Sequence, residues 1–521
     1  MLRADRRGFL RRALALAASG FLAPDLARAQ ARPRFAAPPF SLGVASGSPT
    51  ASGFVLWTRL APEPLAGGGL GPEAIEVRWE IAHDEKFSRI VKQGTALAGA
   101  SRAHAVHVEA EGLDPARWYH YRFMAGGETS TVGRARTAPG AGAGDERLKL
   151  ALASCQHYEQ GLFVAHRHLA AESPDLVAFV GDYIYERSRK GGRVREHHTG
   201  EPKTLSQYRD RYAQYKTDAD LQSSHACAPW IATWDDHEVA NDYANDRGED
   251  LDPDFLARRA AAYRAYFEHL PLRPSVLRPD GEMRLYATHA WGGLANLFVL
   301  DDRQYRAHQA CPKASRGGSN VVGPGCTERT EARRTMLGAP QERWLDEGLA
   351  SSTARWNLIV QQTLMAPAGS DGPKGVQHWT DGWDGYPWAR ARLLDSLARS
   401  GAANPVVLGG DVHAHYVANL HARPDDPRSP VVAAEFCGTS ISALGSDARR
   451  VAAIRDANPH IRYADSTQRG YVLLDIGRDR LEARLRVVET VKRADSGVST
   501  AATFAVTAGR PGVEDRDRPS N

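Results

Sequence analysis

The sequence predicts an α/β protein in which a small β-sandwich precedes a larger domain of layered strands and helices. Short alternating strands between turns fill residues 40–137. After the Gly/Ala/Pro-rich segment 138–145, apolar strand-like runs alternate with helical patterns, which indicates an α/β layer fold over residues 146–510. The chain has 521 residues, more than a single hydrophobic core usually serves, so two domains are expected.

Composition and charge exclude several classes of protein. Hydrophobic residues make up 42% and charged residues 25%, which is ordinary for a soluble globular chain and not for a disordered one. The formal net charge of +4 comes entirely from residues 1–29, where six arginines stand against two aspartates. The remainder carries sixty side chains of each sign, so we expect no nucleic-acid-binding surface.

The N-terminus is typical of a twin-arginine signal peptide. Arg6-Arg7-Gly8-Phe9-Leu10 is followed by the apolar run Ala13–Leu22 and the small-x-small site Ala27-Arg28-Ala29. The apolar run is too short to span a bilayer comfortably, although an uncleaved anchor is the alternative. We expect cleavage near Ala29 and twin-arginine export to the periplasm or beyond. That machinery carries folded proteins, which suits a chain that takes up metal in the cytoplasm.

The first domain has the pattern of a small sandwich of the fibronectin or immunoglobulin kind. Residues 75–81 alternate cleanly between apolar and polar side chains. Further short strands are expected at residues 54–58, 105–108 and 118–123. We expect the histidines of this domain to be packed or exposed residues and not ligands; they are His104, His107 and His120.

In the larger domain the apolar runs are short and bounded by turns, as in buried strands. They lie at residues 148–153, 176–180, 230–234, 294–300, 356–361, 405–408, 431–436, 471–476 and 481–487. Residues 161–171 and 255–270 have helical spacing. The polar segment after Val487 is expected to be a loosely ordered tail.

Five cysteines are too few for a disulfide scaffold. Cys311 and Cys326 flank a Gly-, Ser- and Pro-rich loop and are the natural disulfide in an oxidising compartment. Cys227 and Cys437 are expected to be buried free thiols. Cys155 is different, because it directly follows a predicted strand.

Polar side chains of the types that bind metals or phosphate follow strand after strand. Ligands of α/β sheets collect at the carboxyl ends of the strands, so these residues are expected to meet there. Capping residues would explain one such coincidence but not six. The segments are Ser154-Cys155-Gln156, Gly181 to Glu186, Thr233 to Glu238, Leu300 to Arg306, Gln361 to Thr363 and Gly409 to His415.

This set of ligand types favours two unlike metal ions. A carboxylate must bridge the two ions, and Asp182 is the candidate. A thiolate from Cys155 and a phenolate from Tyr185 favour ferric iron, since tyrosine is a rare zinc ligand. Carboxylates at the other ion favour a harder cation such as calcium or magnesium. Two such ions can hold the attacking and leaving oxygens of a phosphoryl transfer.

Two further residues are expected to act on the substrate. His237 follows the candidate ligand Asp236 and is placed to contact the phosphoryl oxygen or the leaving group, or else to orient a carboxylate. Arg303 offers a planar fork for phosphate oxygens, or else pairs with Asp301 or Asp302. Asp235 and Glu238 are expected to hold the ligands in place.

Several motifs together resemble the PhoD-like alkaline phosphatase/phosphodiesterase family, which is related in its metal-binding logic to purple acid phosphatases. The similarity covers nearly the whole chain after the signal segment. The motifs are Phe40 to Pro49 and Leu56 to Leu60 in the first domain, then Ser154-Cys155-Gln156, Gly181 to Glu186, Trp234 to Glu238 and Gly410 to His413.

The resemblance implies a metal centre with two kinds of ion. Ferric iron is expected on Cys155, Asp182, Tyr185 and His413, and one or two calcium ions near Asp182, Asp236 and Asp411. A remaining calcium ligand is left open between Gln361, Gln362 and Asn241. Asp302 departs from the small hydroxyl residue expected before Arg303.

The expected activity is that of a secreted, metal-dependent phosphoesterase of the alkaline phosphatase D type. Metal-activated hydroxide would attack phosphomonoesters or phosphodiesters, including lipid ones, and the chain is expected to be a monomer. Residues 191–200 and 366–387 are expected to border the pocket, with Trp379, Trp383 and Trp388 able to stack on a leaving group. The alternatives are a phospholipase-D-like diesterase, a cysteine hydrolase using Cys155 and His413, and a metal-containing surface protein without activity.

Overall fold

The computed structural model describes residues 33–142, 147–189, 191–278 and 282–517. The predicted signal peptide of residues 1–29 lies outside the described residues. In the described ranges, no helix is both long and apolar enough to cross a membrane.

Among the described residues, the largest sheet has ten strands in the order β24-β23-β22-β21-β9-β10-β11-β1-β2-β5. Strands β9, β10 and β11 are parallel and form its centre. The bounds are β1 (Val44–Thr50), β2 (Gly53–Arg59), β5 (Ala105–Ala110), β9 (Leu148–Ala153), β10 (Leu176–Val180), β11 (Trp230–Thr233), β21 (Arg469–Ile476), β22 (Arg480–Val488), β23 (Val498–Thr507) and β24 (Arg510–Asp517).

A second sheet of seven strands within the described ranges has the order β12-β13-β15-β17-β19-β18-β20. Its central strands β13, β15, β17 and β19 run parallel. The bounds are β12 (Ala287–Trp291), β13 (Ala295–Val299), β15 (Trp356–Val360), β17 (Pro405–Gly409), β18 (His415–His421), β19 (Val431–Cys437) and β20 (Ile461–Asp465).

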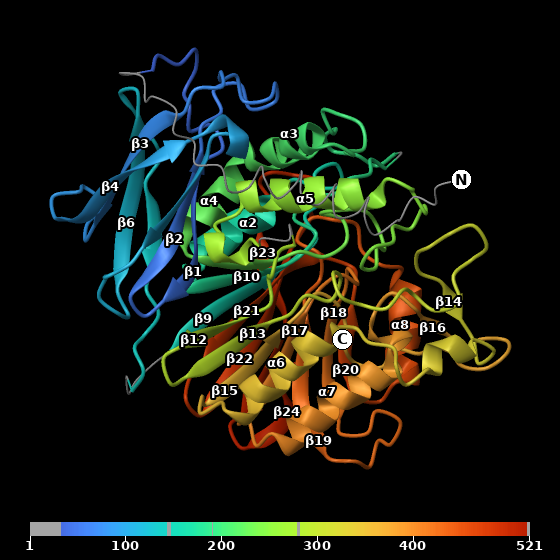
Figure 1. The fold of residues 1–521 in the computed structure, drawn as a ribbon. Coiled ribbons are helices and arrows are strands. Elements are labelled where there is room, and N and C mark those ends of the chain that lie inside the picture. The colour runs from blue at the N-terminus through green and yellow to red at the C-terminus, as the bar shows by residue number, and fades with distance from the viewer. Residues whose placement is uncertain (1–32, 143–146, 190, 279–281, 518–521) are drawn as a thin grey trace, which may run out of the picture.

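The two sheets lie face to face between two layers of helices, as Figure 1 shows. Alternate residues of β9 explain this arrangement: Leu150 and Leu152 pack between the sheets, whereas Ala151 and Ala153 pack against the first helical layer. A strand buried on both faces is apolar on both, and β9 has this pattern from Leu150 to Ala153. The predicted fold class is therefore confirmed.

The helices cover the outer faces of these sheets. Helices α2 (Val164–Ala171), α3 (Leu205–Lys216), α4 (Ala219–Cys227) and α5 (Phe255–His269) lie on the ten-stranded side, and α6 (Gly338–Ala350) and α7 (Pro387–Arg399) on the other. Helix α8 (Ala448–Ala457) precedes β20. Short 3-10 turns occur at Ala100–Arg102, Pro274–Val276, Thr327–Thr330 and Trp383–Gly385.

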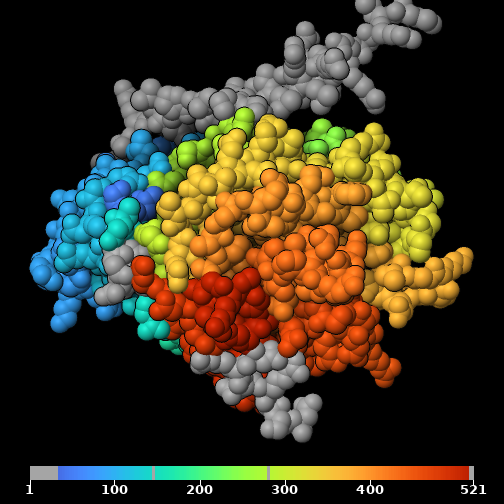
Figure 2. Space-filling model, turned by 90° about the horizontal axis from the view of Figure 1, so that it is seen from below, coloured from blue at the N-terminus to red at the C-terminus, as the bar shows by residue number. Residues whose placement is uncertain are grey.

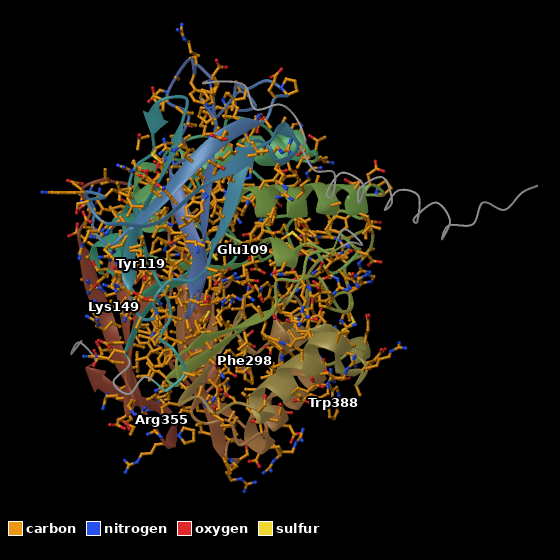
Figure 3. All side chains as sticks on the ribbon, turned by 60° about the vertical axis from the view of Figure 1, so that its left-hand side comes forward. Glu109, Tyr119, Lys149, Phe298, Arg355 and Trp388 are labelled. Carbon is orange, nitrogen blue, oxygen red and sulfur yellow. A yellow bond between two sulfur atoms is a disulfide. The ribbon has the colours of Figure 1, made fainter. Side chains whose placement is uncertain are left out.

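The N-terminal strands form a sandwich whose inner sheet continues into the larger domain. Strand β1 pairs with β11 at Gly47 and Trp230, where a Cβ on Gly47 would lie 2.5 Å from the Pro271 carbonyl oxygen. The outer sheet contains β3 (Ile75–Ala82), β4 (Ile90–Ala98), β6 (Trp118–Ala125), β7 (Glu128–Thr129) and β8 (Gly133–Arg136). Figure 3 labels Glu109 and Tyr119 on the two sheets of this sandwich.

The expected disulfide is present between Cys311 and Cys326. The loop that it closes contains β14 (Val321–Val322), which pairs with β16 (His378–Trp379) in a small ribbon. Cys437 is a buried free thiol as expected, whereas Cys227 is free but only half-buried. Cys155 is a buried free thiol as well.

The expectation of a loose C-terminal tail was wrong. Residues 498–517 form the hairpin β23–β24, which turns at Gly509 and extends the ten-stranded sheet. Phe504 and Val506 are buried because alternate side chains of β23 face the core between the sheets. The backbone of Val513 donates to Asn419 Oδ1 at 2.9 Å, so β24 is also tied to the second sheet. Figure 2 shows these red residues beside the orange ones of that sheet.

Replacing Phe504 with alanine tests whether this hairpin belongs to the cooperative core. The Phe504 side chain is buried, so its loss should lower the free energy of unfolding by about 3–5 kcal/mol. The measurement is a denaturant titration of the full chain, with the exposed Ser499→Ala on the same strand as control. An unchanged midpoint for Phe504→Ala would show that the hairpin folds separately.

Candidate metal centre and active site

Four of the six predicted metal ligands have left-handed backbone conformations. Cys155, Asp182, Asp411 and His413 have φ values of 61°, 56°, 65° and 50°. Each follows the end of β9, β10 or β17, so the chain turns sharply and directs the side chain across the end of the sheet. Such conformations cost about 1–3 kcal/mol each and are found at functional sites. The observation therefore points to the strand ends as the site.

Glycines let these turns pack closely. A Cβ on Gly181 would lie 2.4 Å from Asp235 Cβ, and one on Gly410 would lie 2.4 Å from Ser154 Oγ. Both distances are too short for any side chain, so only glycine fits at these positions.

The four predicted iron ligands converge on one point. The Tyr185 hydroxyl donates to Asp182 Oδ2 at 2.7 Å and lies 2.9 Å from His413 Nε2. Ligand atoms of Cys155, Asp182 and His413 lie within 4.8 Å of one another. His413 Nδ1 donates to the Leu444 carbonyl at 2.7 Å, which leaves the Nε2 lone pair for a ligand. Tyr183 instead bonds to His225 in the core.

A second group of carboxylates lies beside the first. Asp182, Asp236 and His237 form one set of atoms within 4.8 Å, and Asp236, Asp242 and Asp381 form another. Asp411 Oδ2 accepts a hydrogen bond from Thr363 Oγ1 at 2.6 Å. Asp182 and Asp236 therefore connect the convergent point to a wider acidic site.

Arg303 lies beneath these carboxylates. Its Nε donates to Asp235, and its Nη1 donates to Asp381 Oδ2 at 2.7 Å. Its Nη2 is 3.7 Å from Asp236 and 3.9 Å from Asp411. The guanidinium is buried among acids and is not part of the cavity wall described below. The Arg303 guanidinium forms no ion pair with Asp301 or Asp302 in the described residues. The Asp301 carboxylate accepts a hydrogen bond from the backbone N–H of Arg303 instead.

His237 faces the cavity and is held by Glu186. Its Nδ1 bonds to Glu186 Oε2 at 2.6 Å, and the Asn241 backbone donates to the other Glu186 oxygen at 2.9 Å. Burial alone would lower the pKa of His237, but Glu186, Asp182 and Asp236 outweigh it and raise that pKa well above its usual range. A protonated imidazole with Nδ1 occupied has only Nε2 left to donate to a substrate.

The charge of the site calls for cations. Burial, together with Asp236, raises the pKa of Asp182 well above its usual range, although His237 opposes the shift. Burial raises the pKa of Asp242 and of Asp411 to about 7, with neighbouring carboxylates adding to it. Burial and Asp182 also raise the pKa of the Cys155 thiol. These groups resist ionisation because they are buried and, to a lesser extent, because they lie beside other carboxylates. The donor set fits hard cations and ferric iron.

The remaining candidate ligands differ in their surroundings. Gln361 Oε1 accepts from Thr363 and Trp383, and Gln362 Oε1 accepts from the Asp302 backbone. Both amides are therefore engaged by the protein, whereas Asn241 lines the cavity. Asp302 lies away from the cavity wall, where burial raises its pKa to about 7.

The acidic group opens into a cavity of about 380 Å³. Its wall includes Asp182, Asp236, Asp242, Asp411, His237 and His413, together with Ala366, Ala368, Trp379, Gly382 and Trp383 from the loop 366–387. The loop 191–200 does not contribute to this wall, although Arg189 just before it does. Trp388 lies on the outer side of α7, half exposed, as Figure 3 shows.

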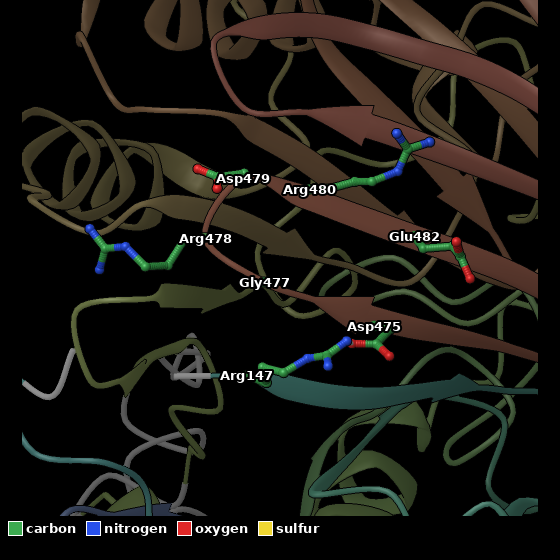
Figure 4. A pocket seen from close by; sticks show the side chains of 7 residues that line it. All are labelled: Arg147, Asp475, Gly477, Arg478, Asp479, Arg480 and Glu482. Atoms are coloured by element: carbon green, nitrogen blue, oxygen red, sulfur yellow. The ribbon is translucent and has the colours of Figure 1, made fainter. Parts of the chain in front are cut away.

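A larger hollow of about 490 Å³ lies at the other end of β9 (Figure 4). Its wall consists of Arg147, Asp475, Gly477, Arg478, Asp479, Arg480 and Glu482. Arg147 precedes β9, whereas Cys155 follows it, so the strand separates this hollow from the acidic site. Its charges are paired, with Arg147 and Asp475 3.0 Å apart, and it holds none of the potential metal-binding groups found in the described residues.

Comparison with known proteins identifies the family. A model of the PhoD-like phosphatase matches residues 150–485, and a model of the N-terminal domain of PhoD-like phosphatases matches residues 26–139. The chain belongs to the PhoD-like phosphatase family. The resemblance inferred from the strand-end motifs is therefore confirmed.

Two relatives support the same assignment. Alkaline phosphatase D of Bacillus subtilis (strain 168) is 44% identical over 485 residues, which cover 91% of this chain and 82% of that protein. A solved structure described as the structure of PhoD has 43% identity, a TM-score of 0.89 and 94% coverage of both chains. The chain is thus a hydrolase of phosphoric esters, and its family implies dependence on metal ions.

Sequence reasoning missed three residues of the site. Glu186, which orients His237, was noted only as the end of a motif. Asp242 follows the Asp236 motif by six residues, and Asp381 lies in the Trp- and Gly-rich loop that was expected to border the pocket. The available signal was an acidic residue, Asp381, within the loop 366–387 that was expected to border the pocket.

Glu186→Gln tests how His237 is held. Removing the Glu186 charge takes away the first of the carboxylates that raise the pKa of His237, so that pKa should fall. A proton-donating His237 would then lose its proton at lower pH, and the alkaline limb of the pH–activity profile should move to lower pH. The control is Glu201→Gln, since Glu201 pairs with Arg258 and Arg187 and is not a hydrogen-bond partner of His237. An unmoved limb in Glu186→Gln would contradict this role.

Proposed function

We propose that this protein is an exported, metal-dependent phosphoesterase that acts on phosphomonoesters, phosphodiesters or both. The observation that carries the proposal is the convergence of Cys155, Asp182, Tyr185 and His413 beside a second group of buried carboxylates. Sulfur, phenol, imidazole and carboxylate at one point suit ferric iron, and carboxylates alone suit calcium.

Ferric iron would be held by Cys155, Asp182, Tyr185 and His413. One calcium ion would be held by Asp182, Asp236 and Asp411. The adjoining group formed by Asp236, Asp242 and Asp381 supports a second calcium ion. When bound, such ions neutralise phosphoryl charge and make water a stronger nucleophile at moderate pH.

The residues of the chain supply position and a proton. His237, protonated and held by Glu186, donates from Nε2 to the leaving-group oxygen as its bond to phosphorus breaks. Arg303 keeps Asp235 and Asp381 in place and stabilises the nearby charges of Asp236 and Asp411. It therefore acts on the substrate through the carboxylates and not by direct contact.

Export by the twin-arginine machinery remains part of the proposal, on the evidence of Arg6-Arg7 and the segment that follows. The Cys311–Cys326 disulfide is consistent with an oxidising compartment. The alternative, a phospholipase-D-like activity, would use the same metal centre. It would differ from the proposed activity only in its substrate, a lipid phosphodiester with an alcohol leaving group. A cysteine hydrolase is disfavoured, because burial raises the pKa of Cys155 whereas a nucleophilic thiol needs a lowered one.

Asp182→Ala tests the proposal directly. Asp182 belongs to both groups of ligand atoms, so its removal should disrupt both ions and lower kcat/KM for phosphoesters by about a thousandfold. The assay uses 4-nitrophenyl phosphate, bis(4-nitrophenyl) phosphate and phosphatidylcholine, with metal content measured in parallel. Asp395→Asn, exposed on α7, is the control. Wild-type protein that hydrolyses none of the three, or Asp182→Ala with full activity, would contradict the proposal.

A further inference from the structure

The active-site cavity extends past the acidic group towards helix α8. Its wall there contains Ser446, Asp447, Arg450, Val451 and Ile454, and it also includes Leu364, Ala366 and Trp379. The phosphoryl group binds at the acidic end if the proposed function holds. The rest of the substrate must then occupy the end that α8 borders.

Two arginines of the cavity wall form no ion pair within the described residues. They are Arg189, in the loop that carries Tyr185, and Arg450, in the first turn of α8. Neighbouring arginines of the first loop behave differently: Arg187 lies 2.8 Å from Glu249, and Arg195 lies 2.6 Å from Asp218. Unpaired guanidinium groups on a cavity wall are available to an anionic ligand.

Arg450 is held at a fixed position relative to the metal ligands. Asp447 Oδ1 accepts from the Arg450 backbone at 2.8 Å and caps α8. Ser446 Oγ donates at 2.8 Å to the carbonyl of Val412, which lies between Asp411 and His413. The start of α8 is thus tied to the loop that carries two of the proposed ligands, and the side chain of Arg450 stands on a rigid base.

We propose that Arg450, together with Arg189, binds a second anionic group on the leaving-group side of the substrate. The inference rests on the proposed function and adds the class of substrate: phosphoesters whose leaving group bears a carboxylate or a further phosphate. A guanidinium pairs with either anion through two parallel hydrogen bonds. Arg450 is exposed to solvent at the cavity mouth, so the contribution of such a pair is modest.

Arg450→Gln tests this subsite against a matched control. Gln keeps the helix propensity of Arg and a polar side chain, but it is shorter and carries no charge, and the control below shares this shortening. The substrates are phenyl phosphate and 3-carboxyphenyl phosphate, with their methyl diesters. Arg450→Gln should lower kcat/KM for the carboxyphenyl esters about fivefold to tenfold more than for the phenyl esters. Arg449→Gln, an exposed neighbour on α8 outside the cavity wall, should leave this ratio unchanged.

A binding measurement decides the question independently of turnover. By calorimetry, wild-type protein should bind propane-1,3-diylbisphosphonate, whose P–C bonds a phosphoesterase does not cleave, more tightly than propylphosphonate, and Arg450→Gln should lose most of this preference. An equal loss for charged and uncharged substrates would mean that Arg450 contacts the phosphoryl group, which overturns the inference. Wild-type protein without any preference for the second anion overturns it as well. Failure of the proposed function differs from both, because none of the phosphoesters would then be hydrolysed.

Discussion

The repulsion between buried carboxylates is the interaction on which this structure depends. Asp182, Asp236, Asp242, Asp381 and Asp411 are gathered at one edge of two facing sheets with little access to water. The chain supplies Arg303, Arg306 and His237 as counter-charges. Burial and the neighbouring carboxylates nevertheless raise the pKa values of Asp182, Asp242 and Asp411. Bound cations would remove the remaining repulsion, so the same arrangement that opposes folding prepares the site for metal.

The fold makes this arrangement possible by ending strands at the same edge. Parallel strands β9, β10 and β11 of one sheet and β17 of the other carry the ligand candidates immediately after their last residues. At each of these strand ends, residues in the left-handed conformation and closely packed glycines turn the chain sharply. The backbone strain is confined to these residues, and the packed layers on both sides of the sheets hold them in the left-handed conformation. Arg189 and Arg450 on the cavity wall are proposed to extend this centre towards the rest of the substrate.

The central strands and their ligands could be predicted because they follow simple sequence patterns. Cys155 and Asp182 come directly after apolar runs that are buried on both faces. Residues that follow such strands lie at the carboxyl edge of the sheet, so the position of both ligands follows from the sequence. Asp242 and Asp381 could not be found this way, since they reach the site from long loops whose paths depend on tertiary contacts. The orientation of Arg303 also depends on them, because Asp381 engages the guanidinium that the sequence assigned to phosphate. The hairpin β23–β24 was overlooked because polar and glycine residues mask its alternation.

The pair of variants Tyr185→Phe and Tyr183→Phe tests the central claim most directly. Both residues are buried tyrosines of one loop, but only the Tyr185 hydroxyl points at Asp182 and His413. Wild type and Tyr183→Phe should contain about one iron per chain and show a visible charge-transfer band, whereas Tyr185→Phe should lose the band and contain less iron. A wild-type protein without iron, or an unchanged band in Tyr185→Phe, would contradict the central claim.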